Sequence, residues 1–220
     1  MNCNEKTIYL IRHGETEFNK MHMIQGSGVD SNLNDTGREQ AKAFYQAYKH
    51  IHFDKIYTSL LKRTKQSVAS FISQGTPTEG LQGLNEISWG NREGKTINEA
   101  DDSLYSDMMI AWKNGEMHHK LPNGESPLEV SERQKIAFKH IMNQEHEQNI
   151  LICMHGRAMR IFLCLLLEKP LIYMDKFKHE NLCLYVLRYR RGKFELELEN
   201  DHKHLVKTEI KHKYMATSMA

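Results

Sequence analysis

The stretch TIYLIRHGET, residues 7–16, decides the fold class of this chain. Its first half, Thr7 to Ile11, is a short apolar run of the kind that forms a buried strand. The run ends in Arg12-His13-Gly14, and a second apolar run at residues 150–154, ILICM, ends in the same way in His155-Gly156. The carboxyl ends of the strands share one edge of an open α/β sheet, and ligands usually bind there. We therefore expect His13 and His155 to converge at that edge.

The rest of the chain alternates in the same manner between strand and helix patterns. Alternation of this kind predicts an α/β layered fold around a mostly parallel sheet. A terminal hairpin is expected around Arg191-Gly192, because Phe194, Leu196 and Leu198 alternate with glutamates. The other expected strands are 54–58 and 149–154. The expected helices start at the capping-box pattern Thr36-Gly37-Arg38-Glu39, near Leu61 (running to Ile72), at Thr96-Ile97-Asn98-Glu99, at Ser126-Pro127-Leu128-Glu129 and near Arg157.

Composition limits the classes of function. The 220 residues carry 30 Lys and Arg against 28 Asp and Glu, a net charge of +2, so we expect no nucleic-acid partner. No linker divides the chain, and we expect a single domain over residues 1–220. No run reaches the length of a membrane span, and no signal peptide is evident at the start. The four scattered cysteines are interpreted as reduced, which indicates a cytoplasmic protein. His118-His119 is expected to be solvent-exposed, without a metal role.

The residues at the strand ends suit phosphoryl chemistry. A third strand ends at Tyr57-Thr58-Ser59 and leads into a helix that carries Arg63 in its first turns. Arg12 and Arg63 can hold a phosphoryl group through forked, charge-assisted hydrogen bonds. With its oxygens held, an imidazole nitrogen can attack phosphorus, since histidine is a competent covalent nucleophile. Two arginines and a second histidine supply the positive charge, so the chemistry requires no metal or other cofactor.

The same residues resemble the histidine phosphatase superfamily, also called the phosphoglycerate mutase-like family. Ordered matches run from residue 8 to about residue 160, which makes the resemblance far more specific than a lone R-H-G. The matching segments are Arg12-His13-Gly14-Glu15-Thr16 with Asn19, Gln25-Gly26, Leu33 to Gly37, Tyr57 to Thr64, Leu84-Asn85-Glu86-Ile87 with Trp89-Gly90 and Glu93-Gly94, Asn123 to Ser126, and His155-Gly156, with Asn181 as a weaker match near the end.

The resemblance implies a three-layer α/β/α sandwich with a small capping insertion after the acidic motif. It also implies that His13 accepts the phosphoryl group, that Glu86 is the acid and base, and that His155 completes the catalytic set. The implied substrate-binding residues are Arg12, Asn19, Gln25, Gly26, Arg63 and Gly156, with no metal ligand. Arg157 departs from the family pattern, and the sequence leaves open whether it reaches the substrate or faces solvent.

The resemblance therefore implies a metal-independent phosphomonoesterase that acts through a phosphohistidine on a small phosphorylated metabolite. Two alternatives remain. A cofactor-dependent phosphoglycerate mutase uses the same intermediate but carries a longer insertion than residues 87–121. A non-catalytic phospholigand-binding member would bind without turnover. The sequence does not identify the substrate, and it leaves a homodimer open.

Overall fold

The computed structural model describes residues 5–96 and 103–205. Its strands are β1 (Lys6–Arg12), β2 (Lys55–Thr58), β3 (Thr78–Gly80), β4 (Asn149–Met154), β5 (Leu184–Arg190) and β6 (Lys193–Asp201). Its α-helices are α1 (Glu17–Lys20), α2 (Asp35–Tyr48), α3 (Lys62–Ser67), α4 (Ala69–Ser73), α5 (Ser103–Lys113), α6 (Pro127–Met142) and α7 (Gly156–Leu166). Short 3-10 turns are η1 (Gln82–Leu84), η2 (Gly90–Arg92), η3 (Leu171–Lys176) and η4 (Lys203–Leu205).

One six-stranded sheet in the order β3-β2-β4-β1-β5-β6 forms the centre of the fold. Strands β3, β2, β4 and β1 run parallel, whereas β5 pairs antiparallel with both β1 and β6. In the β1–β4 register Arg12 pairs with Met154, so both strands end at the same level. The residues that follow, His13 and His155, consequently start from the same edge of the sheet, as expected. The mostly parallel α/β class is confirmed.

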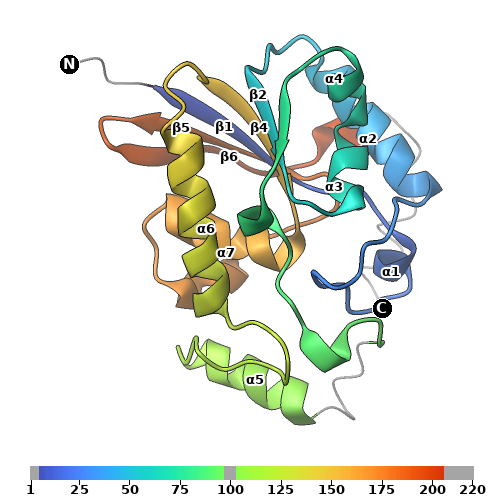
Figure 1. Ribbon diagram of the computed structural model, residues 1–220, viewed down its shortest axis with the longest axis vertical. Coiled ribbons are helices and arrows are strands. Elements are labelled where there is room, and N and C mark those ends of the chain that lie inside the picture. The colour runs from blue at the N-terminus through green and yellow to red at the C-terminus, as the bar shows by residue number, and fades with distance from the viewer. Residues whose placement is uncertain (1–4, 97–102, 206–220) are drawn as a thin grey trace.

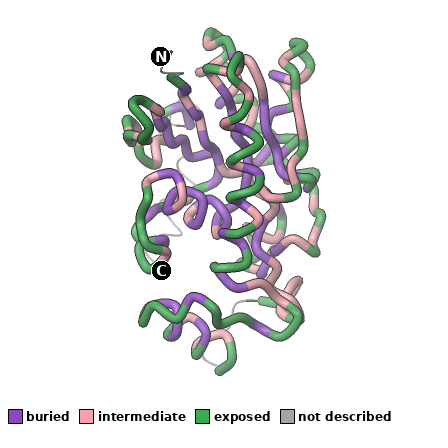
Figure 2. The backbone as a smooth tube through the Cα atoms, turned by 60° about the vertical axis from the view of Figure 1, so that its left-hand side comes forward, coloured by how far each residue is buried: buried purple, intermediate pink, exposed green. Residues whose placement is uncertain are grey.

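Helices cover both faces of this sheet (Figure 1). On one face α6 and α7 pack Val130, Ile141 and Phe162 against the strands. On the other face α2 and α4 contribute Phe44 and Phe71. Burial follows the strands through the middle of the molecule, and the outer helix surfaces are exposed (Figure 2). The three-layer arrangement is therefore confirmed.

The segment after the acidic motif leaves the layers. Helix α5 lies at the lower end of the view in Figure 1, away from the sheet. Its residues Met108 and Trp112 are buried, while Leu104 and Ile110 are exposed. This is the expected capping insertion. The helix start expected at Thr96-Ile97-Asn98-Glu99 falls largely outside the described residues, and the described helix begins at Ser103.

Two helix predictions need correction. Helix α2 begins one residue before the expected capping box, because Asn34 is the N-cap and its Oδ1 accepts the Gly37 N–H at 2.8 Å. The single helix expected from Leu61 to Ile72 is two short helices that meet at Val68. The Ser67 hydroxyl donates to the Arg63 carbonyl oxygen at 2.7 Å, a bond to the preceding turn that often bends helices.

Other local predictions are confirmed. Ser126 caps α6 in a reciprocal capping box with Glu129, and Pro127 is the first helical residue. The hairpin β5–β6 turns at Arg191 and Gly192, both with positive φ. The short edge strand β3 was not predicted, because TEG has no apolar pattern.

Candidate active site

The loop after β1 is held close to the start of α2. A Cβ atom on Gly14 would lie 2.7 Å from the Gly37 carbonyl oxygen, and one on Gly37 would lie 2.1 Å from the Glu15 carbonyl oxygen. Only glycine fits at both positions. The Gly14 N–H also donates to Ser67 Oγ at 2.9 Å, which ties this loop to α3. The backbone that carries His13 is thus fixed from two sides.

His13 is buried as a neutral imidazole with a defined tautomer. Its Nδ1 lies 2.7 Å from the Gly14 carbonyl oxygen. A carbonyl oxygen can only accept, so Nδ1 carries the proton and Nε2 keeps its lone pair. Burial is the main cause that holds the pKa of His13 well below its usual value, and the charges of Arg63 and Arg12 lower it further. An unprotonated Nε2 is the form in which an imidazole can act as a nucleophile.

His155 lies beside His13, with 5.1 Å between the ring centroids. Its Nδ1 accepts a hydrogen bond from Arg63 Nε at 3.1 Å, so its proton resides on Nε2, which donates to Ser59 Oγ at 2.8 Å. Burial, followed by the charge of Arg63, holds the pKa of His155 well below its usual value. Both ring nitrogens therefore have protein partners, and the ring is neutral.

Arg63 is a fully buried cation in the wall of the site. Besides the bond to His155, its terminal nitrogens donate to the carbonyl oxygens of Val29 at 2.6 Å and Gly26 at 3.1 Å. These bonds use three of the five guanidinium N–H groups. Burial lowers the pKa of Arg63 to about 10, with a raising contribution from Glu86, so the group stays charged at neutral pH.

Arg12 is held by a part of the chain that the sequence did not indicate. Its NH1 donates to the His179 carbonyl oxygen at 2.8 Å, and the His179 ring is bonded through Nδ1 to Arg160 at 2.8 Å. Gly156 touches both groups, since a Cβ there would lie 2.5 Å from His179 Cδ2 and 3.5 Å from Arg12 Nε. The predicted substrate-binding residue Gly156 thus makes room for this arrangement.

Glu86 is 6% exposed and accepts backbone N–H groups at the start of α7. Its Oε1 accepts from Ile87 at 2.9 Å and from Ala158 at 2.8 Å, and its Oε2 accepts from Arg157 at 3.1 Å. Since the N-cap residue His155 makes no side-chain cap bond, Glu86 supplies the cap from another segment. The backbone amides of Arg157 and Ala158, which follow Gly156, are thus bonded to Glu86.

Arg133 on α6 organises the loop that carries Glu86. Its guanidinium donates to the carbonyl oxygens of Asn85 at 2.9 Å and Glu86 at 3.0 Å. The charge of Arg133 is paired with Glu125 at 2.8 Å. Nothing in the sequence pattern indicated this role, because Arg133 lies 47 residues from Glu86 and has no motif of its own.

Asn19 is connected to the backbone of the loop that carries His13. Its Oδ1 accepts from Thr16 N at 3.2 Å and from Asn181 Nδ2 at 3.3 Å, and Asn181 also donates to the His13 carbonyl oxygen at 2.9 Å. The first pair is part of the capping box of α1. Asn19 is thus brought to the edge of the site, and Asn181, a weak signal in the sequence, links it to His13.

Gln25 and Gly26 follow α1 in the chain and form hydrogen bonds to other residues of the site. Gln25 Oε1 accepts from Thr16 Oγ1 at 2.9 Å, and its amide nitrogen is bonded to the Ser31 hydroxyl. Gly26 contributes its carbonyl oxygen to Arg63, as described above. Both residues hold neighbouring side chains of the site, Thr16 and Arg63, and their predicted direct contact with substrate stays a prediction.

Arg157 points toward the capping insertion. Its guanidinium lies 5.3 Å from the centroid of the Trp112 ring and pairs with Asp175. Its side chain is only 10% exposed. The sequence left open whether Arg157 reaches the substrate or faces solvent. The structure rules out the second alternative, because the side chain joins α7 to α5 and η3.

The assembled site unites an unprotonated imidazole, two arginines and a buried carboxyl group. Arginines of this kind bind phosphoryl oxygens, and a neutral imidazole can receive phosphorus. This combination is suited to the transfer of phosphoryl groups through a histidine. Comparison with known proteins identifies the family.

Residues 8–202 match the histidine phosphatase superfamily (branch 1), and the chain belongs to that superfamily. It is 32% identical to a broad-specificity phosphatase of Saccharomyces cerevisiae, over 71% of this chain and 68% of that protein. It is also 30% identical to a protein of Cronobacter sakazakii named as a probable phosphoglycerate mutase, over 84% and 86% of the two chains.

Among solved structures, a phosphoserine phosphatase of Entamoeba histolytica crystallised with phosphoserine is similar, with a TM-score of 0.78 and 29% identity. The match covers 91% of this chain and 99% of that one. The superfamily and the named phosphatases agree with the expectation from the sequence: the chain is a phosphatase. No helix within residues 5–96 and 103–205 is long and apolar enough to cross a membrane.

Proposed function

We propose that this phosphatase hydrolyses small phosphomonoesters through a phosphohistidine formed on His13. The observation that carries the proposal is the tautomer of His13, whose Nδ1–H is bonded to the Gly14 carbonyl oxygen and whose Nε2 is thereby left with its lone pair. The ring of His13 lies 5.1 Å from that of His155, which accepts the Arg63 Nε–H. Attack of Nε2 on phosphorus forms an N–P bond while the bond to the leaving oxygen breaks. Arg12 and Arg63 neutralise charge on the phosphoryl oxygens in this step.

Glu86 is assigned the proton transfers. Its Oε1 already accepts two amide N–H groups, whereas Oε2 accepts one, so Oε2 retains a lone pair for a proton. A protonated Oε2 gives its proton to the leaving oxygen, which departs as an alcohol. In the second step the carboxylate takes a proton from the attacking water, the N–P bond breaks, and inorganic phosphate leaves with Glu86 protonated again.

His155 is assigned the alignment of Arg63. Because Nδ1 of His155 accepts from Arg63 Nε, the plane of the guanidinium is fixed before substrate arrives. A direct bond from His155 to the phosphoryl group requires that its Nε2–H leave Ser59 Oγ. A neutral imidazole can do both, because it accepts at Nδ1 and donates at Nε2.

Hydrolysis is favoured over the mutase alternative by the size of the insertion. Only residues 87–121 lie between the acidic motif and the loop before α6, and they contain one described α-helix, α5. The non-catalytic alternative is disfavoured because all the groups needed for turnover, Arg12, His13, Arg63, Glu86 and His155, are present.

The remaining expectations rest on composition and on the cysteines. The near-balanced charge supports the expectation of no nucleic-acid partner. Cys153, Cys164 and Cys183 are buried free thiols, which supports a cytoplasmic location. We propose that residues 1–220 act as one domain, and light scattering would decide whether it forms a homodimer.

The test combines a substrate panel with trapping of the intermediate. Phosphoserine, 3-phosphoglycerate with a trace of bisphosphoglycerate, and a sugar phosphate are each offered to the purified chain. We expect release of inorganic phosphate from at least one, and acid-labile label on the wild type after rapid quenching of a labelled substrate.

His13→Ala should lose both signals, while His50→Ala, which changes an exposed histidine, should keep them. Fast formation of 2-phosphoglycerate without phosphate release would instead identify a mutase. Binding without turnover of any ester would identify a phospholigand-binding protein.

A further inference from the structure

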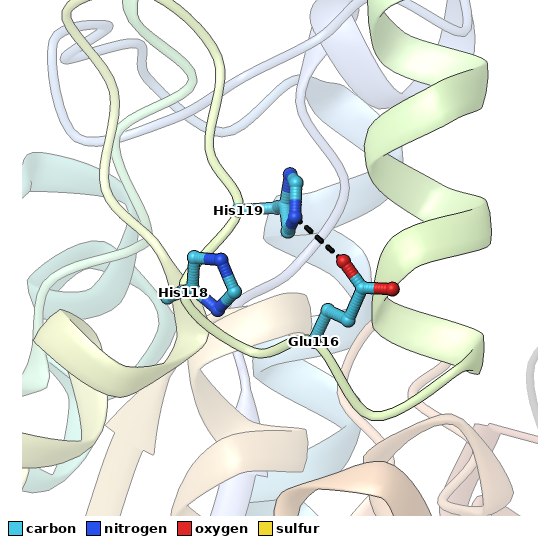
Figure 3. Close-up of side chains that lie close together, drawn as sticks. All are labelled: Glu116, His118 and His119. Carbon is cyan, nitrogen blue, oxygen red and sulfur yellow. Dashed lines mark ion pairs between the residues drawn. The ribbon is translucent and has the colours of Figure 1, made fainter.

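The turn that follows α5 carries a second group of reactive side chains, outside the catalytic site. Glu116, His118 and His119 project from this turn, and all three are exposed (Figure 3). The exposure of the histidine pair agrees with the expectation from the sequence. The sequence did not indicate that Glu116 lies against this pair, with its Oε2 at 2.7 Å from His119 Nε2, and this contact is the reason to revise the expectation that the pair has no metal role.

The backbone of the turn is anchored, so the three side chains start from fixed positions. Met117 and Leu121, on either side of the histidines, are buried. The Trp112 indole N–H donates to the His119 carbonyl oxygen at 2.8 Å, and the His119 N–H donates to the Glu116 carbonyl oxygen at 3.3 Å. A ligand that binds here therefore meets a turn that is already ordered.

The donor atoms have the chemistry and the spacing of a zinc-type site. One carboxylate oxygen and two imidazole nitrogens all lie within 4.8 Å of one another. Bonds of about 2.1 Å in a tetrahedral site place neighbouring donors about 3.4 Å apart. Figure 3 shows the Glu116–His119 ion pair, which must open for an ion to bind both residues. Small rotations of these exposed side chains are sufficient for that.

Local charge also favours a cation at this turn. Lys120 is adjacent but is paired with Glu129 at 2.5 Å. In the catalytic site, by contrast, the histidines lie beside Arg63 and Arg12, and both cations repel a divalent ion. Compared with the catalytic histidine pair, the turn is thus the better suited to a metal.

We propose that Glu116, His118 and His119 form a surface site for a zinc-class divalent transition-metal ion, with water in the remaining position. The ion joins groups within a single turn and does not take part in phosphoryl transfer. The ion stiffens the turn that accepts the hydrogen bond from the Trp112 indole, and the Arg157 guanidinium lies over the same indole ring.

Titration calorimetry with zinc on the full, untagged chain tests this site at about pH 7, where an ordinary imidazole is mostly neutral. We expect a binding event in the wild type that His118→Ala/His119→Ala removes. Glu116→Gln, which keeps both rings but removes the charge, should weaken it by about tenfold or more.

The matched control is His50→Ala/His52→Ala, which removes another surface histidine pair with a carboxylate nearby, His52 Nε2 lying 3.5 Å from Asp54. This variant should bind zinc as the wild type does. The proposal is wrong if the wild type binds no zinc, or if the double variant at 118 and 119 binds it equally well.

A second measurement separates this site from the catalytic one. Phosphate release by the variant lacking both histidines of the turn should equal that of the wild type, with or without zinc pre-bound. If removing the turn histidines abolished turnover, the ion would be catalytic and the peripheral site proposed here would be wrong.

Discussion

Arg63 donates its Nε–H to Nδ1 of His155 at 3.1 Å, so the second histidine of the site acts as an acceptor toward the arginine that it adjoins. This bond forces the proton of His155 onto Nε2, where Ser59 accepts it. The bond thereby fixes both the orientation of the Arg63 guanidinium and the tautomer of the neutral His155 ring. Lysine, with a single charged nitrogen, cannot reproduce this arrangement.

Arg63→Lys should therefore reduce kcat/KM strongly although the charge is retained. Loss of a preorganised donor toward the reacting group typically costs about 100- to 1,000-fold, and we expect a loss in that range. Steady-state kinetics with the best ester measure it. The control is Lys62→Arg, the reverse exchange at the exposed neighbouring position, which should leave the rate unchanged. Wild-type activity in Arg63→Lys would show that catalysis does not need the several N–H donors of the guanidinium group.

Glu86→Gln should harm esters of poor leaving groups most. General acid catalysis is typically worth about 100- to 10,000-fold, so a sugar phosphate should slow by about that factor. p-Nitrophenyl phosphate should slow less in the first step, because its leaving group hardly needs a proton. Single-turnover measurements separate phosphorylation of His13 from its hydrolysis.

An equal first-step loss for both esters would limit Glu86 to capping α7. Thermal unfolding of the variant is needed alongside, since loss of a helix cap costs about 0.5–2 kcal/mol. Glu93→Gln is the informative comparison, because Glu93 is the carboxylate that would replace Glu86 as the acid.

The protein should lose stability as pH falls below about 6.5, the ordinary value for histidine. Burial lowers the pKa of His204 to about 4 and that of His179 to about 2, and the pKa values of His13 and His155 are also lowered. The unfolded chain thus takes up protons that the folded chain refuses, and this contribution is fully present only above about pH 6.5.

Denaturant titrations between pH 4 and 6.5 measure how the free energy of unfolding changes with pH. The variant His204→Phe isolates the contribution of one histidine to that change. His204 packs against Phe44 and Tyr48, away from the catalytic residues. The variant should show a shallower fall of the unfolding free energy with acid. His50→Ala, at an exposed histidine, should keep the wild-type slope.

Strong chelators should leave the rate of phosphate release unchanged. The positive charge that the phosphoryl group needs is supplied by Arg12 and Arg63, and the proposed metal site lies on the capping insertion. Assays before and after chelation, with the zinc content measured, test this. A rate lost on chelation and restored by zinc, magnesium or manganese would mean that the histidine pair at the sheet edge has been misinterpreted.

The cap of α2 provides a prediction about stability. Asn34→Ala should lower the free energy of unfolding by about 1 kcal/mol, because Asn34 supplies the cap bond to Gly37. Thr36→Ala, at the position that the sequence pattern favoured, should change it by less than about 0.5 kcal/mol. Denaturant melts of both variants decide which residue caps the helix.

Local patterns predicted most of the sheet and the pair of histidines. Apolar runs that end in Arg12-His13-Gly14 and His155-Gly156 are sufficient, since parallel strands end at a common edge. The start of α6 was also readable, because Ser126 and Glu129 satisfy one another within a single turn.

What could not be predicted depends on segments that are distant in the sequence. Glu86 caps a helix that starts 70 residues later, Arg133 orders the Glu86 loop from α6, and His179 holds Arg12 from beyond η3. The break at Val68 also escaped prediction, since the apolar spacing continues through it. Such contacts need the folded chain, because no spacing rule relates their members.

The five groups assigned to the reaction all belong to the layered body and its loops, whereas α5 belongs to the insertion that leaves it. Trp112, on that insertion, meets the body through Arg157. Residues 103–121 are therefore a natural region for directed evolution, because substitutions there leave the groups assigned to the reaction unchanged.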